Sequence, residues 1–387
     1  MGVVRARVPI TADLVELRYA YGPHLLPDPG PVSDMWRYRD LLPIGEGTVR
    51  YPLPAGGTPL LALPGLRGVF PHLWVKDETR SPSCSNKDRA TALACELALR
   101  EGKTAITAAS TGNVAVSLAV GAAAAGLQAY IFVSPAVDPG KLRLMLQAGA
   151  TVFTVEEGYA AAFELSRRAA AAFGWYDRNT GVNPITLEAK KTVAFEIWEQ
   201  LDRAIPEVMV IPVGDGTTLS AIAKGFRELR ACGAGTRLPR LIGVQAAGCR
   251  PLMRAWLGET AGEIGTTIAD GIFVTVPSNA ETALRDVVES GGAFVSVPDE
   301  AILQAMSDLA RRGGILAEPA AAAAYAGLLQ ARSQKLIDVE ETVVIEITGS
   351  ALKTPRYLEG RAGRVLPIHA DLAQVAERLA AAGLRSR

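Results

Sequence analysis

From about residue 73 onward, short runs rich in β-branched residues alternate with helical patterns, and this alternation constrains the fold more than any other feature. Runs such as LWVKDE, KTAITAAS, VMVIPV and TVVIEIT predict strands, while residues 87–100 and 112–125 are among the stretches that predict helices. Strands that alternate with helices form βαβ crossovers, and these build parallel sheets with helices on both faces. The sequence therefore predicts an α/β fold of open parallel sheets.

A chain of 387 residues is long for a single hydrophobic core, so two α/β domains are expected. We predict an N-terminal segment, residues 1–72, that packs on the larger domain, then a smaller domain, residues 73–183, and a larger domain, residues 184–387. The chain is expected to cross between the domains near the loop YDRNTGVNP, residues 176–184. The tail DLAQVAERLAAAGL has the pattern of an amphipathic helix.

Composition argues against several classes of function. The 40 basic residues equal the 40 acidic ones, so no excess charge favours nucleic acid or an anionic membrane surface. No run approaches the roughly 20 apolar residues of a membrane span. The four cysteines and three histidines are too scattered for a disulfide framework or a metal site. The N-terminus lacks the apolar core of a signal peptide, and a cytoplasmic location is expected.

Open α/β sheets bind their ligands at the carboxyl ends of strands, and suggestive loops follow four of the predicted strands. These loops are SPSCSNKDR, which contains Lys87; AASTGN, residues 108–113; VGDGTTLS, residues 213–220; and ITGS, residues 347–350. In the second loop, backbone N–H groups and the hydroxyls of Ser110 and Thr111 are suited to hold a carboxylate at a helix N-terminus. An ordinary N-cap has the same pattern and is the alternative interpretation.

The loop VGDGTTLS has the features of a phosphate cradle. Gly214 and Gly216 let the backbone approach an anion, the threonines add hydroxyl donors, and a helix N-terminus favours negative charge. It is not a Walker A loop, because no GK[ST] follows. It is a poor dinucleotide fingerprint, because Leu219 holds the third glycine position and the strand RLIGVQA ends without an acidic residue. A simple tight turn is the alternative.

Several motifs occur together in this one chain: GGTPLL, STGN, NPITLEAKKTVAFEI, LAEPAAAAA and TGSALK. With these motifs the chain resembles the fold type II pyridoxal-phosphate enzymes, and among them the threonine synthase branch, from about residue 36 to residue 355. The resemblance implies a fold like that of the tryptophan synthase β-subunit and pyridoxal 5'-phosphate as cofactor. It also implies a small amino acid as substrate and a homodimer.

The same resemblance implies roles for residues of the strand-end loops. Lys87 would carry the cofactor as a Schiff base, Asn113 would contact its ring hydroxyl, and Thr348 would face its pyridine nitrogen. The cofactor phosphate would be held by Gly214, Asp215, Gly216, Thr217 and Thr218. We also expect the substrate to be bound by Lys76, Ser110, Thr111, Gly112 and Asn183, and for Lys76 a surface residue at the end of its strand is the alternative. For Glu318 two interpretations stay open, a place near the ring or the entrance and an acid at a helix N-terminus.

The chain departs from the family's pattern where a substrate phosphate would bind. Val114, Gly181 and Thr186 replace a threonine, a serine and an arginine of the kind that bind the phosphate of O-phosphohomoserine. Losing an arginine contact and two hydroxyls would weaken such binding by roughly two orders of magnitude or more. Beside the reactive lysine, Cys84 replaces a glycine and Asn86 replaces an aromatic residue, and in the phosphate loop Asp215 replaces an asparagine.

We therefore expect a β- or γ-elimination or replacement on an amino acid that lacks a distal phosphate, with the substrate and the leaving group open. A neutral threonine facing the ring nitrogen favours such reactions over transamination. The alternative is a threonine synthase that converts O-phosphohomoserine to threonine and phosphate, with Lys76 or Lys190 in a rearranged phosphate site. A third interpretation is a non-catalytic binding homologue of the family or a dinucleotide-binding dehydrogenase. The missing glycine and ribose acid disfavour the dehydrogenase.

Overall fold

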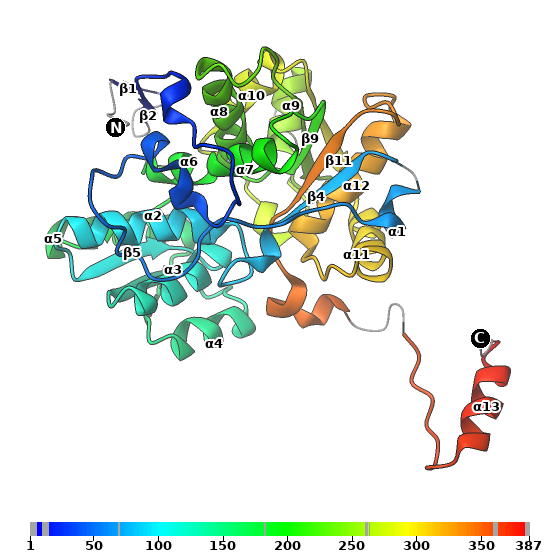
Figure 1. The fold of residues 1–387 in the computed structure, drawn as a ribbon. Coiled ribbons are helices and arrows are strands. Elements are labelled where there is room, and N and C mark those ends of the chain that lie inside the picture. The colour runs from blue at the N-terminus through cyan, green and yellow to red at the C-terminus, as the bar shows by residue number, and fades with distance from the viewer. Residues whose placement is uncertain are drawn as a thin grey trace. The chain divides into compact units, whose positions relative to one another are not determined.

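The computed structural model describes residues 6–9, 15–68, 70–181, 183–259, 262, 264–358 and 363–383. The chain divides into two compact units, Met1–Tyr357 and Leu358–Arg387. The predicted tail helix forms in the second unit as α13 (Leu372–Ala381), and it buries none of its residues. Every strand of the described residues belongs to the first unit, whose ribbon is drawn from blue to orange in Figure 1.

Four parallel strands form the smaller sheet, in the order β7-β6-β5-β8. They are β5 (Ala105–Ala109), β6 (Gln128–Val133), β7 (Thr151–Thr154) and β8 (Tyr176–Asp177). The helices of this part are α2 (Lys87–Arg100), α3 (Asn113–Ala124), α4 (Pro139–Gln147) and α5 (Tyr159–Phe173). Helix α2 begins and ends where the sequence predicted it.

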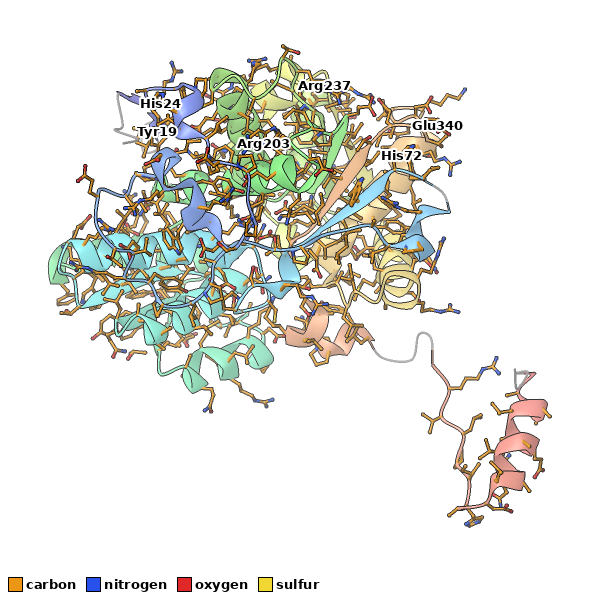
Figure 2. The ribbon with its side chains drawn as sticks, in the orientation of Figure 1. Tyr19, His24, His72, Arg203, Arg237 and Glu340 are labelled. Atoms are coloured by element: carbon orange, nitrogen blue, oxygen red, sulfur yellow. The ribbon has the colours of Figure 1, made fainter. Side chains whose placement is uncertain are left out.

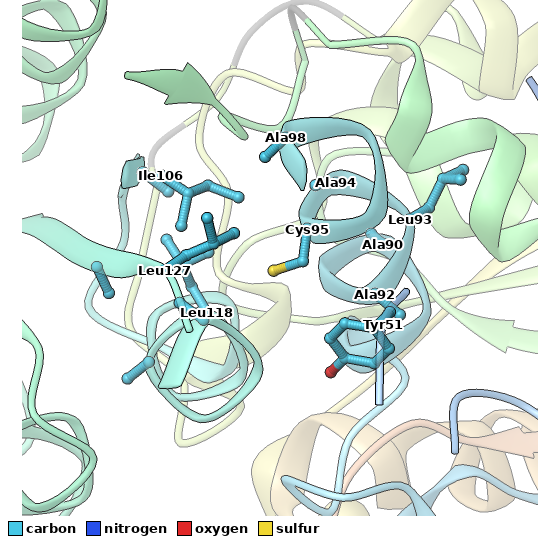
Figure 3. Close-up of a cluster of buried hydrophobic side chains, with 14 of the residues drawn as sticks. Tyr51, Ala90, Ala92, Leu93, Ala94, Cys95, Ala98, Ile106, Leu118 and Leu127 are labelled. Atoms are coloured by element: carbon cyan, nitrogen blue, oxygen red, sulfur yellow. The ribbon is translucent and has the colours of Figure 1, made fainter. Parts of the chain in front are cut away.

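Neighbouring residues of these strands point to opposite faces of the smaller sheet and enter different hydrophobic cores. Ile106 and Ala108 of β5 pack with α2 and α3, in the core that Figure 3 shows around Cys95 and Leu118. Ala109 packs instead in a cluster with residues of α5. The smaller sheet therefore carries helices on both faces, as the alternation of strands and helices predicted.

Six strands form the larger sheet, in the order β11-β10-β9-β12-β4-β3. They are β3 (Leu60–Leu61), β4 (Leu73–Asp77), β9 (Val208–Pro212), β10 (Arg240–Ala246), β11 (Ala293–Val297) and β12 (Val343–Ile347). Strand β3 runs antiparallel to β4, and the other neighbours are parallel. On one face, Met209 and Ile211 pack with α8 (Thr217–Ala231) and α10 (Ala280–Glu289) contributes further residues.

Helix α12 (Pro319–Ser333) packs against the central strands of this sheet. Its buried residues include the run Ala320–Ala324, and at Gly327 an added Cβ would lie 2.2 Å from Cγ2 of Val244 on β10. The small residues therefore bring the helix axis close to the sheet, as expected for an alanine-rich helix.

The remaining elements include an antiparallel pair of strands and several helices and turns. They are β1 (Ala6–Pro9), β2 (Val15–Arg18), α1 (Pro64–Arg67), α6 (Ile185–Lys190), α7 (Thr192–Gln200), α9 (Pro251–Leu257), α11 (Asp299–Gly313) and the 3-10 turns η1 (Pro23–Leu25), η2 (Met35–Leu41), η3 (Glu78–Arg80), η4 (Asp270–Ile272), η5 (Ala351–Lys353) and η6 (Pro355–Leu358). Within the described part of the chain, no helix is long and apolar enough to cross a membrane.

The structure differs from the sequence prediction in how segments are shared between the two sheets. The strand LWVKDE, which we assigned to the smaller domain, pairs as β4 with β12 of the larger sheet. The N-terminal segment, predicted to pack on the larger domain, contributes to both cores. Leu17 and Tyr38 enter the core of the larger sheet, whereas Met35 and Tyr51 enter that of the smaller one. The domain limits at residues 73 and 183 stay a prediction.

Candidate active site

The loops at four strand ends meet in the first unit, as the sequence predicted from their places after β4, β5, β9 and β12. The backbone N–H of Asn86 donates to the carbonyl of Thr348 at 2.9 Å, and that of Ser350 donates to the carbonyl of Cys84 at 3.0 Å. A short antiparallel bridge joins Ser85 to Gly349. These contacts fasten the loop that carries Lys87 to the end of β12.

A cavity of about 240 Å³ opens between these loops. It collects most of the predicted site residues: Lys87, Ser110, Thr111, Gly112, Asn113, Gly214, Asp215, Thr218 and Thr348. Val114, Tyr159, Lys190, Asp270 and Glu318 also line it. Four predicted site residues do not line it: Gly216 and Thr217, which begin α8, and Lys76 and Asn183.

Lys87 is the first residue of α2, and its half-buried side chain lines the cavity. The preceding turn passes through Cys84, whose φ of 57° is in the left-handed region that favours glycine. Lys353 fixes this turn, because its Nζ donates to the carbonyls of Ser83 at 2.8 Å and Cys84 at 2.6 Å. Cys84 therefore occupies a strained position that the surrounding contacts hold, and its departure from glycine has a backbone cost.

Asn113, at the start of α3, is oriented by Glu318. Its Nδ2 donates to Oε1 of Glu318 at 2.6 Å, whereas Asn113 Oδ1 and Glu318 Oε2 are buried without a partner. Burial raises the pKa of Glu318. Gly349 leaves room for this pair, because an added Cβ would lie 2.4 Å from Oε1 of Glu318. Glu318 is both the N-cap residue of α12 and a wall of the cavity, so both interpretations of this residue stay open.

The start of α8 is shaped as an anion-binding turn. Gly216, with φ of 89°, is its N-cap, and an added Cβ would lie 2.9 Å from the carbonyl oxygen of Asn279. Asp215 caps the first turn, since its carboxylate accepts from the N–H and the hydroxyl of Thr217, each at 2.9 Å. The hydroxyl of Ser220 is buried without a partner. Donors and a free hydroxyl at a helix N-terminus suit a phosphate.

Two further ionisable residues lie beside Lys87: Lys190, which the sequence suggested only for a rearranged phosphate site, and Glu346, which it did not single out. Lys190 is 3% exposed, and its Nζ donates to the hydroxyl of Thr218 at 2.7 Å. Burial and the neighbouring charge of Lys87 hold the pKa of Lys190 well below its usual value. Glu346 is buried on β12, accepts from Nδ2 of Asn86 at 3.1 Å, and has its pKa raised by burial to about 7.

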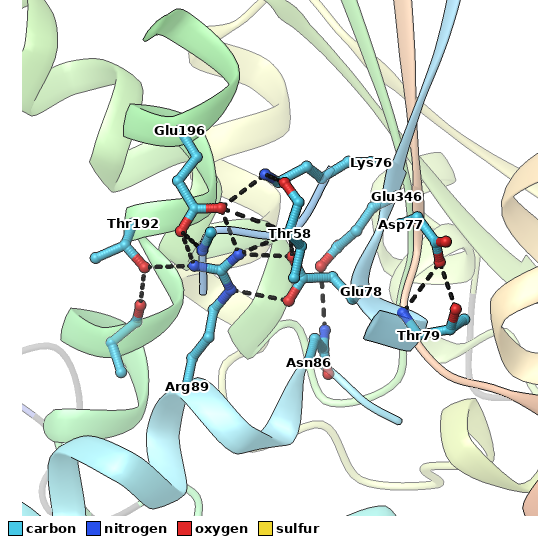
Figure 4. A network of polar contacts seen from close by, with 12 residues as sticks. Thr58, Lys76, Asp77, Glu78, Thr79, Asn86, Arg89, Thr192, Glu196 and Glu346 are labelled. Carbon is cyan, nitrogen blue, oxygen red and sulfur yellow. Dashed lines mark hydrogen bonds and ion pairs between the residues drawn. The ribbon is translucent and has the colours of Figure 1, made fainter. Parts of the chain in front are cut away.

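Lys76, predicted to bind substrate, belongs instead to a closed ion network (Figure 4). Its Nζ lies 2.6 Å from Glu196, and Arg89 bridges Glu196 and Glu78. Burial would raise the pKa of Glu196, but Arg89 and Lys76 together lower it to about 2. Lys76 is fully buried and its amine has carboxylate, amide and carbonyl acceptors, so it has no group left for a substrate.

The loop between β8 and α6 is held by its own polar residues. Asn183 donates from Nδ2 to the carbonyl of Asp177 at 2.7 Å and accepts from the N–H of Ile185 at 3.0 Å, so it shapes the loop rather than the cavity. Arg178, which the sequence did not single out, is buried and donates to the hydroxyl of Thr180 at 3.0 Å. Burial lowers the pKa of Arg178 to about 10.

The described side chains include no group of three or more His, Cys, Asp or Glu residues placed to hold a metal ion. His24 and His72 lie on separate segments, well apart in Figure 2. The cavity wall combines amines, amides and hydroxyls with the carboxyl groups of Asp215, Asp270 and Glu318.

Comparison with known proteins relates this site to a family. Residues 52–349 match the family described as pyridoxal-phosphate dependent enzyme. A threonine synthase of Mycobacterium leprae is 37% identical over 357 residues, which cover 91% of this chain and 96% of that protein. A threonine synthase of Methanosarcina acetivorans is 38% identical over 329 residues, which cover 83% of this chain and 80% of that protein.

Solved structures share the fold at lower identity. An L-serine ammonia-lyase from the fungus Rhizomucor miehei superposes with a TM-score of 0.66 at 22% identity, over 79% of this chain and 98% of that one. The processed form of threonine deaminase isoform 2 from Solanum lycopersicum gives a TM-score of 0.64 at 20% identity, over 84% and 88% of the two chains. The predicted fold type and cofactor are confirmed. This chain belongs to the pyridoxal-phosphate-dependent enzymes, among the relatives of threonine synthase.

Proposed function

We propose that this enzyme catalyses elimination or replacement at the β or γ carbon of an amino acid that lacks a distal phosphate. One observation carries the proposal: Lys87, Asn113 and Thr348 line the same cavity as the start of α8. An amine, an amide, a hydroxyl and a helix N-terminus are the groups that an aldehyde cofactor with a ring and a phosphate requires.

Pyridoxal phosphate fits the unpaired polar atoms of this cavity. We assign the phosphate to the segment Gly214–Thr218 at the N-terminus of α8, of which Gly214, Asp215 and Thr218 line the cavity. We assign the ring hydroxyl to Asn113, the ring nitrogen to Thr348 and the aldehyde to Lys87. Asp215 adds a negative charge to this segment, and the Nζ of Lys190 donates to the hydroxyl of Thr218 in the same segment.

The reaction would divide between the cofactor and the chain. When bound, pyridoxal phosphate supplies an electron sink for the charge that develops at the substrate's α carbon. The Nζ of Lys87 takes the proton from that carbon and returns it, as a general base and acid in the cavity wall. The segment Ser110–Gly112 at the start of α3 binds the substrate carboxylate. Glu318 keeps Asn113 turned toward the cavity through their 2.6 Å hydrogen bond.

The absence of a phosphate on the substrate is proposed from three positions. Val114 gives the cavity wall an isopropyl group. Gly181 has no side chain, although an added Cβ there would lie 2.9 Å from the hydroxyl of Ser278. Thr186 is 4% exposed on α6 and does not line the cavity. These three residues offer few hydrogen-bond donors to a phosphate on the substrate. A hydroxyl or an O-acetyl group requires fewer donors than a phosphate, so it suits this wall better.

A second candidate is threonine synthase acting on O-phosphohomoserine. It is favoured by relatives of that name at 37% and 38% identity over most of this chain. In this case Lys190 is the cation available to a rearranged phosphate site, because Lys76 is bound to Glu196.

The experiment that separates the candidates is a substrate panel on the enzyme loaded with pyridoxal phosphate. The panel contains L-serine, L-threonine, L-homoserine and their O-phospho and O-acetyl esters, and ammonia, keto acid, threonine and phosphate are measured. We expect turnover of an unphosphorylated substrate. Threonine and phosphate from O-phosphohomoserine alone would establish the second candidate. A wild-type protein without a visible cofactor band, indistinguishable from Lys87→Ala, would exclude both.

We also propose that the enzyme is a cytoplasmic homodimer. The cysteines Cys84, Cys95, Cys232 and Cys249 are all free thiols, which suits a reducing compartment. The homodimer follows from the resemblance to the family. Light scattering after gel filtration tests it, and a monomer at micromolar concentration would contradict it.

A further inference from the structure

Lys190 differs from the other buried lysines in how its amine is paired. Six lysines of the described chain are buried: Lys76, Lys141, Lys190, Lys191, Lys224 and Lys353. Four of them have a carboxylate partner, namely Lys76 with Glu196, Lys141 with Asp270, and both Lys191 and Lys224 with Glu228.

Lys353 donates to two backbone carbonyls, whereas the described hydrogen-bond partners of Lys190 are the hydroxyl of Thr218 at 2.7 Å and the amine of Lys87. A buried ammonium with three donors is stable only when charge and hydrogen bonds compensate its desolvation. A neutral hydroxyl and a second amine do not provide that compensation, so the surroundings of Lys190 favour the uncharged amine.

The residues around Lys190 further favour its uncharged amine. Lys87 faces it from α2 and lines the same cavity, and burial followed by the charge of Lys87 keeps the pKa of Lys190 well below its usual value. Two carboxyl groups oppose the effect, Asp215 from the loop before α8 and Glu346 from β12. Glu346 itself faces Glu78 as well as both lysines, and burial raises its pKa to about 7.

We propose that Lys190 is the proton partner of Lys87, so that the two amines hold one proton between them. The step is a simple transfer: an N–H bond breaks at Nζ of Lys87 and one forms at Nζ of Lys190. The total charge is unchanged, and no other reactant is needed. The hydroxyl of Thr218 accepts a hydrogen bond from Lys190 in either state.

The transfer to Lys190 leaves the amine of Lys87 uncharged, which its proposed role requires. An amine attacks a carbonyl carbon or removes a proton only while it is uncharged. A neighbouring amine that takes the proton frees Lys87, and returns the proton when Lys87 has finished. The inference rests on the proposed use of Lys87, but it concerns a different residue and has a test of its own.

The test is a pH titration of the visible absorption band of the substrate-free enzyme loaded with pyridoxal phosphate. Wild type is compared with Lys190→Met, Lys190→Gln and Glu346→Gln, and with Lys335→Met as a control, in which an exposed lysine is removed. In both Lys190 variants no neighbouring amine competes with Lys87 for the proton. The midpoint pH of the band should therefore be at least about one unit higher than in wild type. In Glu346→Gln the midpoint pH should be lower than in wild type, because the variant lacks the negative charge of Glu346. In Lys335→Met the midpoint should equal that of wild type.

Each outcome decides the proposal. Midpoints of both Lys190 variants within a few tenths of a unit of wild type would overturn it. Loss of the band in both, with thermal stability retained, would assign Lys190 to retention of the cofactor phosphate and would also overturn it. If Lys190→Met does not fold, Lys190→Gln, which keeps a donor for Thr218, gives the answer. A wild-type protein without any band refutes the proposed function instead.

Discussion

At the scale of single residues, Lys76 illustrates how a strand-end lysine can be structural. Its partner Glu196 is 120 residues away in the sequence, and both side chains are fully buried. Removing one member of a buried ion pair leaves an uncompensated charge, although here Arg89 still pairs with Glu196. The network therefore contributes to folding and not to substrate recognition.

Lys76→Met should lower the free energy of unfolding by about 3 kcal/mol, because Glu196 loses a buried partner. The visible cofactor band should stay, because Lys76 does not line the cavity. Urea unfolding and the absorption spectrum measure the two effects, with Lys335→Met, at an exposed position, as the matched control. Unchanged stability with weakened substrate binding would restore the role first predicted for Lys76.

Glu346 gives the site a pH-dependent stability. Its pKa is raised from 4.5 to about 7, so between these values the native state holds a proton that the unfolded chain has lost. Stability then falls as the pH rises through this window, and the loss is complete above about pH 7. The residue cannot be recognised from the sequence, because the groups that surround it, among them Asn86 and Glu78, come from distant segments.

Glu346→Gln should remove this loss. In the cofactor-free protein we expect the variant to be more stable than wild type by about 3 kcal/mol at pH 8, with the difference vanishing near pH 4.5. An amide also offers a donor to Oδ1 of Asn86, which is buried without a partner. Urea denaturation at several pH values measures the difference in the free energy of unfolding. A difference that does not change with pH would contradict the raised pKa of Glu346.

At the scale of elements, small residues set the spacing between helix and sheet. The alanine run of α12 could be recognised as a helix, and its close approach to β10 follows from Gly327. Strand β11 was not predicted from the sequence, because the short run AFVSV follows two glycines and resembles the last residues of a loop. The two-residue strands β3 and β8 carry too short a pattern to be predicted.

Gly327→Ala should destabilise the enzyme by about 1–3 kcal/mol, because the new Cβ would meet Val244 at 2.2 Å and force α12 from the sheet. The matched control is Gly313→Ala near the end of α11, where the nearest atoms are tips of leucine side chains at 3.0 and 3.2 Å. Since alanine favours a helix, the control should be neutral or stabilising. Thermal unfolding compares them, and equal effects would show that spacing is not the cause.

At the scale of the whole first unit, the cavity is assembled from both sheets. Asn113 follows β5 of the smaller sheet, whereas Asp215 and Thr348 follow β9 and β12 of the larger one. The sequence could predict that these loops meet, because parallel strands end at one edge and the motifs are those of a known family. It could not predict that β4 joins the larger sheet, since that pairing depends on contacts with a strand about 270 residues later.

A ligand that contacts loops of both sheets stabilises the folded unit, because the unfolded chain does not assemble the cavity. Pyridoxal phosphate at about 100 times its dissociation constant should add about 2.7 kcal/mol, or about 3 °C in the melting temperature of a chain of this size. Cofactor is removed with hydroxylamine and restored, and calorimetry compares both forms. Lys87→Ala should retain only the part of the shift that the phosphate contacts at α8 provide, and inorganic phosphate measures that part separately. Identical melting temperatures with and without pyridoxal phosphate would show that the cavity does not bind it in the folded state.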